Sequence, residues 1–218
     1  MIRAVFEYGV IGRAIKNGVL EINPVDLRDF ATDKHRSVDD TPFGGGPGMV
    51  MRVDTIDRGI SSIKHQASSV RARTILLSPQ GKMFTQEIAR QYSQLDHLIL
   101  ISGRYEGIDE RVKEHLVDEE LSIGNYVLSG GEIPAMAVAD AVARLLPGVL
   151  GDSESLINES FSSSFGPHPS PLIPMFDFPQ YTQPAEYKGW KIPDVLRSGD
   201  HKKIQVWRQR QSQLKSTQ

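Results

Sequence analysis

The chain has 218 residues, of which 39% are hydrophobic and 24% charged, and it contains no cysteine. This length fits one ordinary domain and a smaller one. The lack of cysteine excludes disulfides, thiolate nucleophiles and the usual structural zinc sites. The sequence has no run of 18 or more apolar residues and no signal-peptide pattern at its start, so we expect a cytoplasmic protein without membrane contact.

Charge is distributed unevenly along the chain. The formal net charge is −2, but residues 185–218 carry eight basic against three acidic residues, a net charge of +5, which leaves −7 for the remainder. A basic segment attached to an acidic body is typical of a protein with a polyanionic partner. A solvated helix face is the alternative interpretation.

The first third of the chain contains one strand-like and one helix-like pattern. Residues 20–27 alternate apolar and polar side chains as a β-strand does. Asp54 is placed to cap a helix in which Ile56, Ile60 and Ile63 recur at helical spacing.

Strand-like and helix-like patterns continue to alternate in the middle of the chain. They predict strands over 74–77, 98–102 and 121–123, and helices over 85–95 and 108–116. Pro134 suits the first turn of a further helix that closes before Pro147. This alternation favours an α/β fold with a mainly parallel sheet covered by helices.

Three loops that contain glycine follow the predicted strands, at residues 77–81, 103–107 and 122–131. Glycine lacks a Cβ, so its main-chain N–H and C=O groups can approach a bound molecule closely. We therefore predict that the three loops converge on one ligand. The alternative is that each loop is only a tight turn between a strand and a helix.

Residues 43–49, 78–81, 103–112 and 122–149 resemble, in this order, the TrmD family of bacterial tRNA (guanine-N1)-methyltransferases, and the resemblance extends over nearly the whole chain. It implies a fold of the SPOUT superfamily: a mainly parallel sheet with helices on both faces, a C-terminal trefoil knot, and a small helical C-terminal domain. The sequence pattern alone predicts an unknotted sheet, because knotted chains are rare.

The resemblance also implies a division into domains. Residues 1–160 correspond to the knotted domain, residues 161–184 to a linker rich in serine and proline, and residues 185–218 to a basic helical tRNA-binding domain. Compared with the family, the chain lacks a first strand and ends early in the helical domain, so we expect Met1 to correspond to an internal methionine.

In the basic segment, Asp200 is placed to cap a helix. We expect Ile204, Trp207 and Leu214 to form the apolar side of this helix.

By the same resemblance, S-adenosylmethionine binds bent in the knot. The residues that match the family's donor site are Leu77, Ser78, Pro79, Gly103, Tyr105, Glu106, Gly107, Ser122, Ile123, Gly124, Asn125, Tyr126, Val127, Leu128, Gly130, Gly131 and Pro134.

Methyl transfer to N1 of guanine requires a base that removes the N1 proton and a donor that stabilises negative charge on O6. Arg144 matches the family's arginine for the second role, although an ordinary i, i+4 pair with Asp140 is the alternative. Glu159 stands where the family usually has the aspartate base, and a carboxylate one methylene longer can still accept the proton. Asp152 and Glu154 are substitutes for this base.

Glu106 matches an acidic residue near the methionine end of the donor, where it holds either Mg²⁺ or the amino group. One carboxylate is a poor magnesium site by itself, so any ion would be shared with RNA or donor. We expect the adjacent Asp109, Glu110 and Arg111 to form pairs at a helix start.

The predicted RNA contacts come from two parts of the chain. One part is a turn and a glycine-rich loop that match the anticodon-facing side of the family, with a flexible turn as the alternative. The other part is the basic C-terminal segment. The residues are His35, Arg36, Gly45, Gly46, Lys188, Lys202, Lys203 and Arg208.

The sequence therefore predicts an enzyme that transfers a methyl group from S-adenosylmethionine to N1 of guanosine-37, 3′ of the anticodon. We expect a homodimer in which the active site lies at the subunit interface. The alternatives are another SPOUT RNA methyltransferase, which acts on a ribose 2′-hydroxyl or a different base, and a non-catalytic module that binds RNA or senses the donor.

Overall fold

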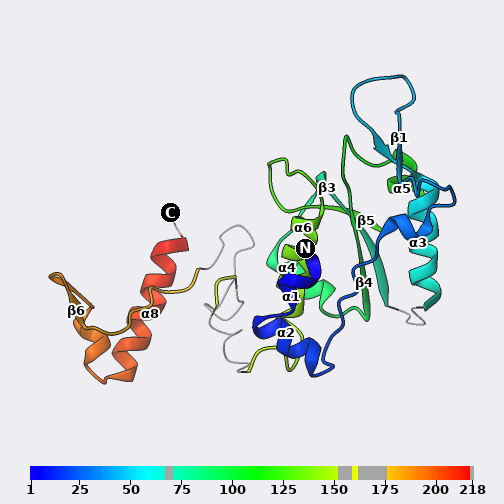
Figure 1. The fold of residues 1–218 in the computed structure, drawn as a ribbon. Coiled ribbons are helices and arrows are strands. Elements are labelled where there is room, and N and C mark those ends of the chain that lie inside the picture. Colours follow the sequence, from blue (N-terminus) through cyan, green and yellow to red (C-terminus); the bar gives the residue numbers. More distant parts are fainter. Residues whose placement is uncertain (67–70, 152–158, 162–175, 217–218) are drawn as a thin grey trace. The chain divides into compact units, whose positions relative to one another are not determined.

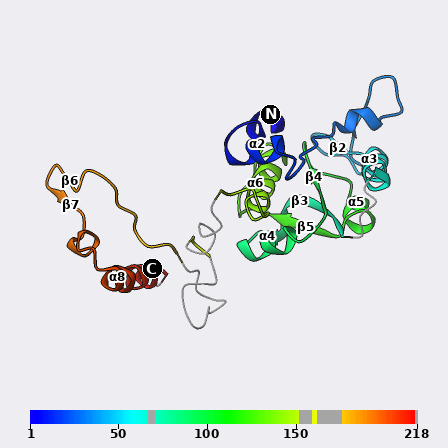
Figure 2. The same ribbon diagram turned by 90° about the horizontal axis from the view of Figure 1, so that it is seen from below.

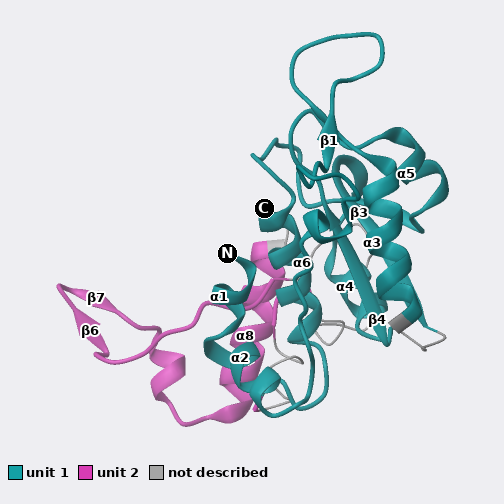
Figure 3. Ribbon diagram, turned by 45° about the vertical axis from the view of Figure 1, so that its right-hand side comes forward, with its two compact units in different colours: residues 1–150 teal, residues 151–218 magenta. Residues whose placement is uncertain are grey.

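The computed structural model describes residues 1–66, 71–151, 159–161 and 176–216. The chain divides into two compact units, residues 1–150 and residues 151–218 (Figure 3). None of the described helices is long and apolar enough to cross a membrane.

The first unit alternates helices and strands along the chain (Figure 1). Its elements are α1 (Ile2–Phe6), α2 (Gly9–Lys16), the 3₁₀ helix η1 (Leu27–Phe30), β1 (Asp39–Asp40), β2 (Val50–Met51), α3 (Val53–Gln66), β3 (Ala72–Met83), α4 (Gln86–Tyr92), β4 (His97–Ser102), α5 (Glu110–His115), β5 (Glu119–Ser122) and α6 (Glu132–Ala143).

The core of this unit is a three-stranded parallel sheet with the order β4-β3-β5. In the central strand β3, Ile75 pairs with Leu100 of β4 and with Glu119 of β5. Residues 74–77 of β3 are buried without a break, as expected for a parallel strand covered on both faces. The predicted α/β class with a parallel sheet is confirmed.

Helices cover both faces of the sheet (Figures 1 and 2). On one face, α4 and α6 pack against Ile75, Leu77 and Leu121. On the other face, α3 and α5 pack against Leu76 and Ile101. Neighbouring residues of β3 therefore point to opposite faces, and each face contributes to a separate apolar cluster.

The predicted strand over 20–27 is wrong. This segment is extended but joins no sheet, and it leads into η1. Its alternating apolar residues pack against helices instead, with Leu20 and Ile22 beside α1 and α2, and Leu27 in the cluster around α3. Alternation indicates that one side of a segment is buried, but it does not provide a strand partner.

Two boundaries near the predicted elements also differ. α3 begins at Val53, so Asp54 lies in the first turn instead of at the cap. β3 does not end at Leu77 but continues to Met83. Thr85, the first residue of the helix predicted over 85–95, is the N-cap of α4, because its hydroxyl accepts a hydrogen bond from the Ile88 amide at 3.4 Å.

The second unit contains a short hairpin of β6 (Glu186–Tyr187) and β7 (Trp190–Lys191), the 3₁₀ helix η2 (Asp194–Arg197) and the helix α8 (His201–Ser216). The predicted cap Asp200 accepts a hydrogen bond from the Lys203 amide at 3.1 Å. The predicted apolar side of α8 is wrong at Leu214, which is 52% exposed, whereas Ser212 is buried and donates to the Phe176 carbonyl at 2.5 Å.

Candidate active site

The three glycine-bearing loops meet at the carboxyl ends of the parallel strands, where they surround one cleft of about 490 Å³. This edge is the usual ligand site of an open parallel sheet. The predicted donor-site residues that line the cleft are Leu77, Ser78, Pro79, Gly103, Tyr105, Glu106, Gly107, Ser122, Ile123, Gly124, Tyr126, Val127, Leu128, Gly130, Gly131 and Pro134.

The first loop is an arch within β3. Leu77 and Lys82 both pair with Leu121 of β5, so residues 78–81 leave the ladder and return to it at the same partner. A Cβ added at Gly81 would lie 2.3 Å from the Leu121 amide nitrogen. Only glycine allows the returning chain to approach β5 this closely.

The second loop, which follows β4, has a constrained backbone. Tyr105 has a φ of +62° and Gly107 a φ of +139°. For tyrosine the left-handed conformation is unfavourable, and such conformations persist where the surrounding structure holds them. Here the Glu106 amide donates to the Met49 carbonyl at 3.0 Å, and the Met51 amide donates to the Gly107 carbonyl at 3.0 Å. The second loop is therefore attached to the segment that follows the glycine-rich residues 44–48.

The third loop folds back on itself and then joins the second loop. A Cβ at Gly124 would meet the Tyr126 ring at 2.1 Å, so this ring lies directly against the glycine. At the end of the loop, the Gly131 amide donates to the Gly103 carbonyl at 2.8 Å, and the Ser102 hydroxyl donates to the Gly131 carbonyl at 3.1 Å. A Cβ at Gly131 would lie 2.7 Å from the Ser102 Cα. The two loops are thus held together by backbone contact.

Acidic side chains outnumber basic ones in the lining of the cleft. The lining contains four acidic residues, Glu106, Asp109, Glu110 and Glu120, and two basic residues, Arg104 and Lys113. Lys113 is already paired with Glu120 at 3.0 Å and with Glu110 at 3.5 Å. Arg104 Nε lies 2.6 Å from Glu132 Oε1. A cationic ligand is therefore favoured in the cleft over an anionic one.

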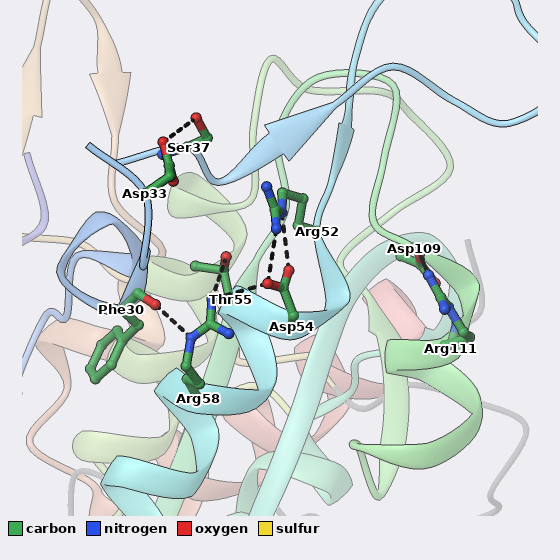
Figure 4. Close-up of polar contacts among 9 residues, drawn as sticks. All are labelled: Phe30, Asp33, Ser37, Arg52, Asp54, Thr55, Arg58, Asp109 and Arg111. Atoms are coloured by element: carbon green, nitrogen blue, oxygen red, sulfur yellow. Dashed lines mark hydrogen bonds and ion pairs between the residues drawn. The ribbon is translucent and has the colours of Figure 1, made fainter. Parts of the chain in front are cut away.

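The predicted pairs at the start of α5 are present. Asp109 caps the helix by accepting from the Arg111 amide at 3.0 Å, and it also accepts from Arg111 Nε at 2.8 Å. The Arg111 guanidinium holds the pKa of Asp109 below its usual value. The pair is drawn in Figure 4.

Several predicted site residues are not brought to the cleft. Asn125 belongs to the third loop but is not part of the lining. Arg144 is the C-cap of α6, which begins at the cleft and runs away from it for 12 residues. Glu159 is half-buried in the second unit, which is described separately from the cleft. The substitutes Asp152 and Glu154 lie outside the described residues.

The predicted RNA-contacting turn is held by short-range hydrogen bonds. The Asp33 carboxylate accepts from the amides of His35 and Ser37, both at 2.9 Å, and from the Ser37 hydroxyl at 2.9 Å (Figure 4). The Ser37 amide keeps the pKa of Asp33 below its usual value. Arg36 forms an ion pair with Asp29, and its Nε donates to the Arg28 carbonyl at 3.2 Å. Hydrogen bonds within residues 33–37 therefore hold the turn, and Arg36 already has protein partners.

A second network attaches the residues on either side of this turn to α3 and to Arg52, which directly precedes it. Asp54 accepts from Arg52 Nε at 3.0 Å and from Arg58 Nη2 at 3.1 Å, and Arg58 Nε donates to the Phe30 carbonyl at 2.7 Å (Figure 4). The Arg52 amide donates to the Val38 carbonyl at 2.9 Å. The hydrogen bonds from Arg52, reinforced by those from Arg58, lower the pKa of Asp54 to about 2.

The glycine-rich loop exposes its glycines. Gly45 and Gly46 have φ values of +78° and +122°, and a Cβ at either would meet no atom within 4 Å. Glycine is required there by backbone conformation and not by lack of space.

The basic residues predicted in the second unit differ in their surroundings. Arg208 stacks over the ring of the buried Phe178, with 4.7 Å between its Cζ and the ring centroid, so it also supports the packing of α8. Lys203 is paired with Asp200 at 3.2 Å. Lys202 is exposed, and Lys188 lies over the Tyr187 ring.

In the part of the chain that the structure describes, no three histidine, cysteine or acidic residues are grouped so that they could hold a metal ion. Glu106 offers only one carboxylate. Its side chain lies against Gly48, because a Cβ added at Gly48 would meet the Glu106 side chain at 2.4 Å. A magnesium ion at Glu106 would have to take its other ligands from water and bound substrates.

Sequence reasoning missed the residues that join the loops. Arg104 and Glu132 connect the second loop to the first turn of α6, and Gln80 and Ser129 add polar groups to the lining. An acidic residue directly after Gly131 is a usual signal of a helix start. Its arginine partner is 28 residues away in sequence, and only the fold reveals the pair.

The fold and the cleft define an α/β protein whose glycine loops surround a cleft at one edge of a parallel sheet, which is the usual place of a small-molecule site. Residues 1–218 match the sequence model of the tRNA (Guanine-1)-methyltransferase TrmD family. The chain belongs to this family, and the predicted resemblance is confirmed.

Individual relatives agree with this family assignment. The chain is 49% identical to the tRNA (guanine-N(1)-)-methyltransferase of Carboxydothermus hydrogenoformans over 205 residues, which cover 94% of this chain and 76% of the relative. It is 48% identical to the protein of the same name from Thermosipho africanus over 218 residues, which cover 100% of this chain and 83% of the relative.

Proposed function

We propose that this chain is a tRNA (guanine-N1)-methyltransferase that uses S-adenosylmethionine and acts on guanosine-37, 3′ of the anticodon. The observation that carries the proposal is the cleft formed by three glycine loops at the carboxyl ends of β3, β4 and β5. Relatives about 48% identical over nearly the whole chain bear the name of this activity.

The lining of the cleft fits the methyl donor. A volume of about 490 Å³ lies within the roughly 300–1,000 Å³ range of small-molecule sites. The acidic excess suits a ligand that carries a sulfonium and an amino group, while Leu77, Ile123 and Leu128 offer apolar surface. When bound, S-adenosylmethionine supplies a methyl group on a positively charged sulfur.

The chain's own residues then have to handle one proton and one developing charge. In the proposal, Glu159 accepts the proton from N1 of guanine, so that a nitrogen lone pair becomes available for the methyl group. The Arg144 guanidinium donates to O6 of guanine, where negative charge develops, and this contact strengthens in the transition state.

The position of Arg144 supports a homodimer. Arg144 ends α6, whose 12 residues span about 18 Å from the cleft at Gly131. This length exceeds the reach of an arginine side chain, which favours a guanine contact made by Arg144 of another copy. In the proposed dimer, Arg144 of one copy therefore serves the donor cleft of the other, and the active site lies at the subunit interface.

The remaining features of the proposal follow from membership of the family. They are the trefoil knot of the SPOUT fold, a C-terminal helical domain that binds tRNA through basic residues such as Lys202 and Lys203, and a cytoplasmic location. Mg²⁺ at Glu106 belongs to the proposal only as an ion shared with the substrates, and the chelator EDTA tests it.

The experiment is methyl incorporation from labelled S-adenosylmethionine into tRNA transcripts that carry either guanosine or adenosine at position 37. We expect incorporation only into the first transcript, with the product a 1-methylguanine that blocks primer extension. Incorporation into both transcripts, or into a ribose, would indicate a different RNA methyltransferase. Absence of incorporation, together with donor or tRNA binding, would indicate a non-catalytic module.

A further inference from the structure

The hairpin of the second unit carries two aromatic side chains on its surface. Trp190 is 71% exposed and Tyr187 is 54% exposed. They are direct partners across β6 and β7, with ring centroids 5.9 Å apart and an angle of 62° between the rings. One exposed aromatic residue is common on protein surfaces, but a cross-strand pair forms a rigid apolar platform.

The turn of the hairpin places a cation beside this platform. Lys188 and Gly189, which connect the strands, have φ values of +52° and +83°. Two left-handed residues in a two-residue turn are typical of a type I′ hairpin, where asparagine and glycine are the favoured pair. Lysine adopts this conformation at an energetic cost. The conformation holds Lys188 Nζ 5.3 Å from the centroid of the Tyr187 ring.

The surroundings of the hairpin are basic. Lys191 in β7 adds a second ammonium group, which lies 3.7 Å from Glu186. Residues 185–218 as a whole carry a net charge of +5. Exposed aromatic faces beside ammonium groups are the combination that binds unpaired nucleotides, because bases stack on the rings while phosphates approach the cations. A partner protein with an apolar surface would gain nothing from this charge.

We propose that the hairpin formed by Tyr187, Lys188 and Trp190 stacks against an unpaired nucleotide of the RNA substrate, with Lys188 beside the phosphate of that nucleotide. This inference rests on the proposed tRNA activity and adds a specific contact to it. Stacking requires an exposed base face, so the nucleotide belongs to a loop or an end of the tRNA and not to a stem.

Substitution of Trp190 tests the stacking contact. We expect Trp190→Ala to raise the KM for tRNA about fivefold to a hundredfold, since one base stacked on an aromatic ring contributes this much to affinity. Both kcat at saturating tRNA and the donor Kd stay unchanged. Trp190→Phe, which keeps a ring, retains most of the affinity. Tyr8→Ala removes an aromatic side chain that is 75% exposed in the first unit and leaves all these values unchanged.

Substitution of Lys188 separates a binding role from a structural one. Glycine adopts positive φ more easily than lysine, so Lys188→Gly should keep or raise the thermal midpoint of unfolding. We expect the same variant to weaken tRNA binding and to reduce its dependence on salt, because one cation near a phosphate is lost. Unchanged affinity and an unchanged salt dependence would overturn the role of Lys188.

Fluorescence gives a readout that does not depend on catalysis. The chain has two tryptophans, Trp190 and Trp207, so the variant Trp207→Phe leaves Trp190 as the single emitter. We expect tRNA to quench this emission. The tRNA concentration at half-maximal quenching should equal the Kd measured by filter binding. Quenching that is absent at saturating tRNA would overturn the inference.

The inference and the proposed function fail in different ways. If the wild-type protein methylates tRNA while Trp190→Ala keeps the wild-type KM, only the hairpin contact is wrong. If the wild-type protein does not methylate tRNA, the proposed function is wrong. If Trp190→Ala changes the mass of the protein in light scattering and leaves tRNA binding intact, the hairpin is a contact between copies, which also overturns the inference.

Discussion

The cleft of the first unit and the hairpin of the second unit present their binding groups in opposite ways. The cleft is formed by loops that touch one another through backbone atoms, and added Cβ atoms at Gly81 and Gly131 do not fit. The hairpin instead exposes large side chains on a short turn. Substitutions in the cleft should therefore affect ligand binding and folding together, whereas substitutions on the hairpin should affect binding alone.

The largest expected effect concerns the proposed base, which belongs to the second unit. We expect Glu159→Gln to lower kcat about 10²- to 10⁴-fold, the usual contribution of a general base. Donor affinity, measured by calorimetry, should stay unchanged because the proposed role of Glu159 is to accept the N1 proton of guanine and not to hold the donor. Asp194→Asn, at another acidic position of the second unit, serves as the matched control with wild-type turnover.

An unchanged turnover of Glu159→Gln would assign the base elsewhere. Asp152→Asn and Glu154→Gln would then be the variants to measure. Loss of donor binding in Glu159→Gln would instead assign Glu159 to donor binding and contradict its proposed role as the base.

A smaller effect is expected from the backbone contact between the second and third loops. Gly131→Val places side-chain atoms against Ser102 and forces the loops apart, since the Cβ alone would lie 2.7 Å from the Ser102 Cα. Overpacking of this kind costs about 1–3 kcal/mol. We expect the affinity for S-adenosylmethionine to fall about tenfold to a hundredfold and the thermal midpoint to fall with it.

The control for this experiment is Gly151→Val, where an added Cβ meets no atom within 4 Å and φ is not in the left-handed region. We expect this variant to bind the donor as the wild type does. Gly124→Val is a weaker test, because the Tyr126 ring that it meets is a side chain and can move. Wild-type donor affinity in Gly131→Val would contradict the proposed position of the donor.

The convergence of the second and third loops was predictable from sequence, because loops that follow parallel strands emerge at the same edge of the sheet. The first loop reaches this edge as an arch within β3, which the sequence pattern did not predict. The helix caps at Thr85, Asp109 and Asp200 could also be predicted from neighbouring residues, since a cap accepts hydrogen bonds from amides within three residues of itself. These features depend on residues that are close in sequence or on a general rule of sheet topology.

The features that sequence reasoning missed depend on distant partners. Residues 20–27 alternate correctly but pack on helices, and the pattern does not contain the identity of the packing partner. The arch in β3 forms because Leu77 and Lys82 both pair with Leu121 of β5. The pair of Arg104 with Glu132 forms because the second loop meets the start of α6.

The smallest expected effect concerns the network of Arg52, Asp54 and Arg58, which attaches Phe30 and Val38, on either side of the turn at residues 33–37, to the start of α3. Arg52 and Arg58 lower the pKa of Asp54 to about 2, below its usual value of 3.8. A carboxyl whose folded pKa is lowered stabilises the fold above its unfolded pKa, and this contribution is lost as the pH falls through the folded pKa. Because Asp54 is 38% exposed, we expect no more than about 1 kcal/mol after solvent screening.

The measurement is the thermal midpoint of the wild type and of Asp54→Asn between pH 7 and pH 2. We expect the variant to unfold about 2–4 °C lower above pH 4, with the difference shrinking between about pH 4 and pH 2. Asp57→Asn, at an exposed acidic position of the same helix, is the control with a small and constant difference. A difference between the wild type and Asp54→Asn that persists unchanged at pH 2 would show that packing, and not the charge of Asp54, holds the turn on α3.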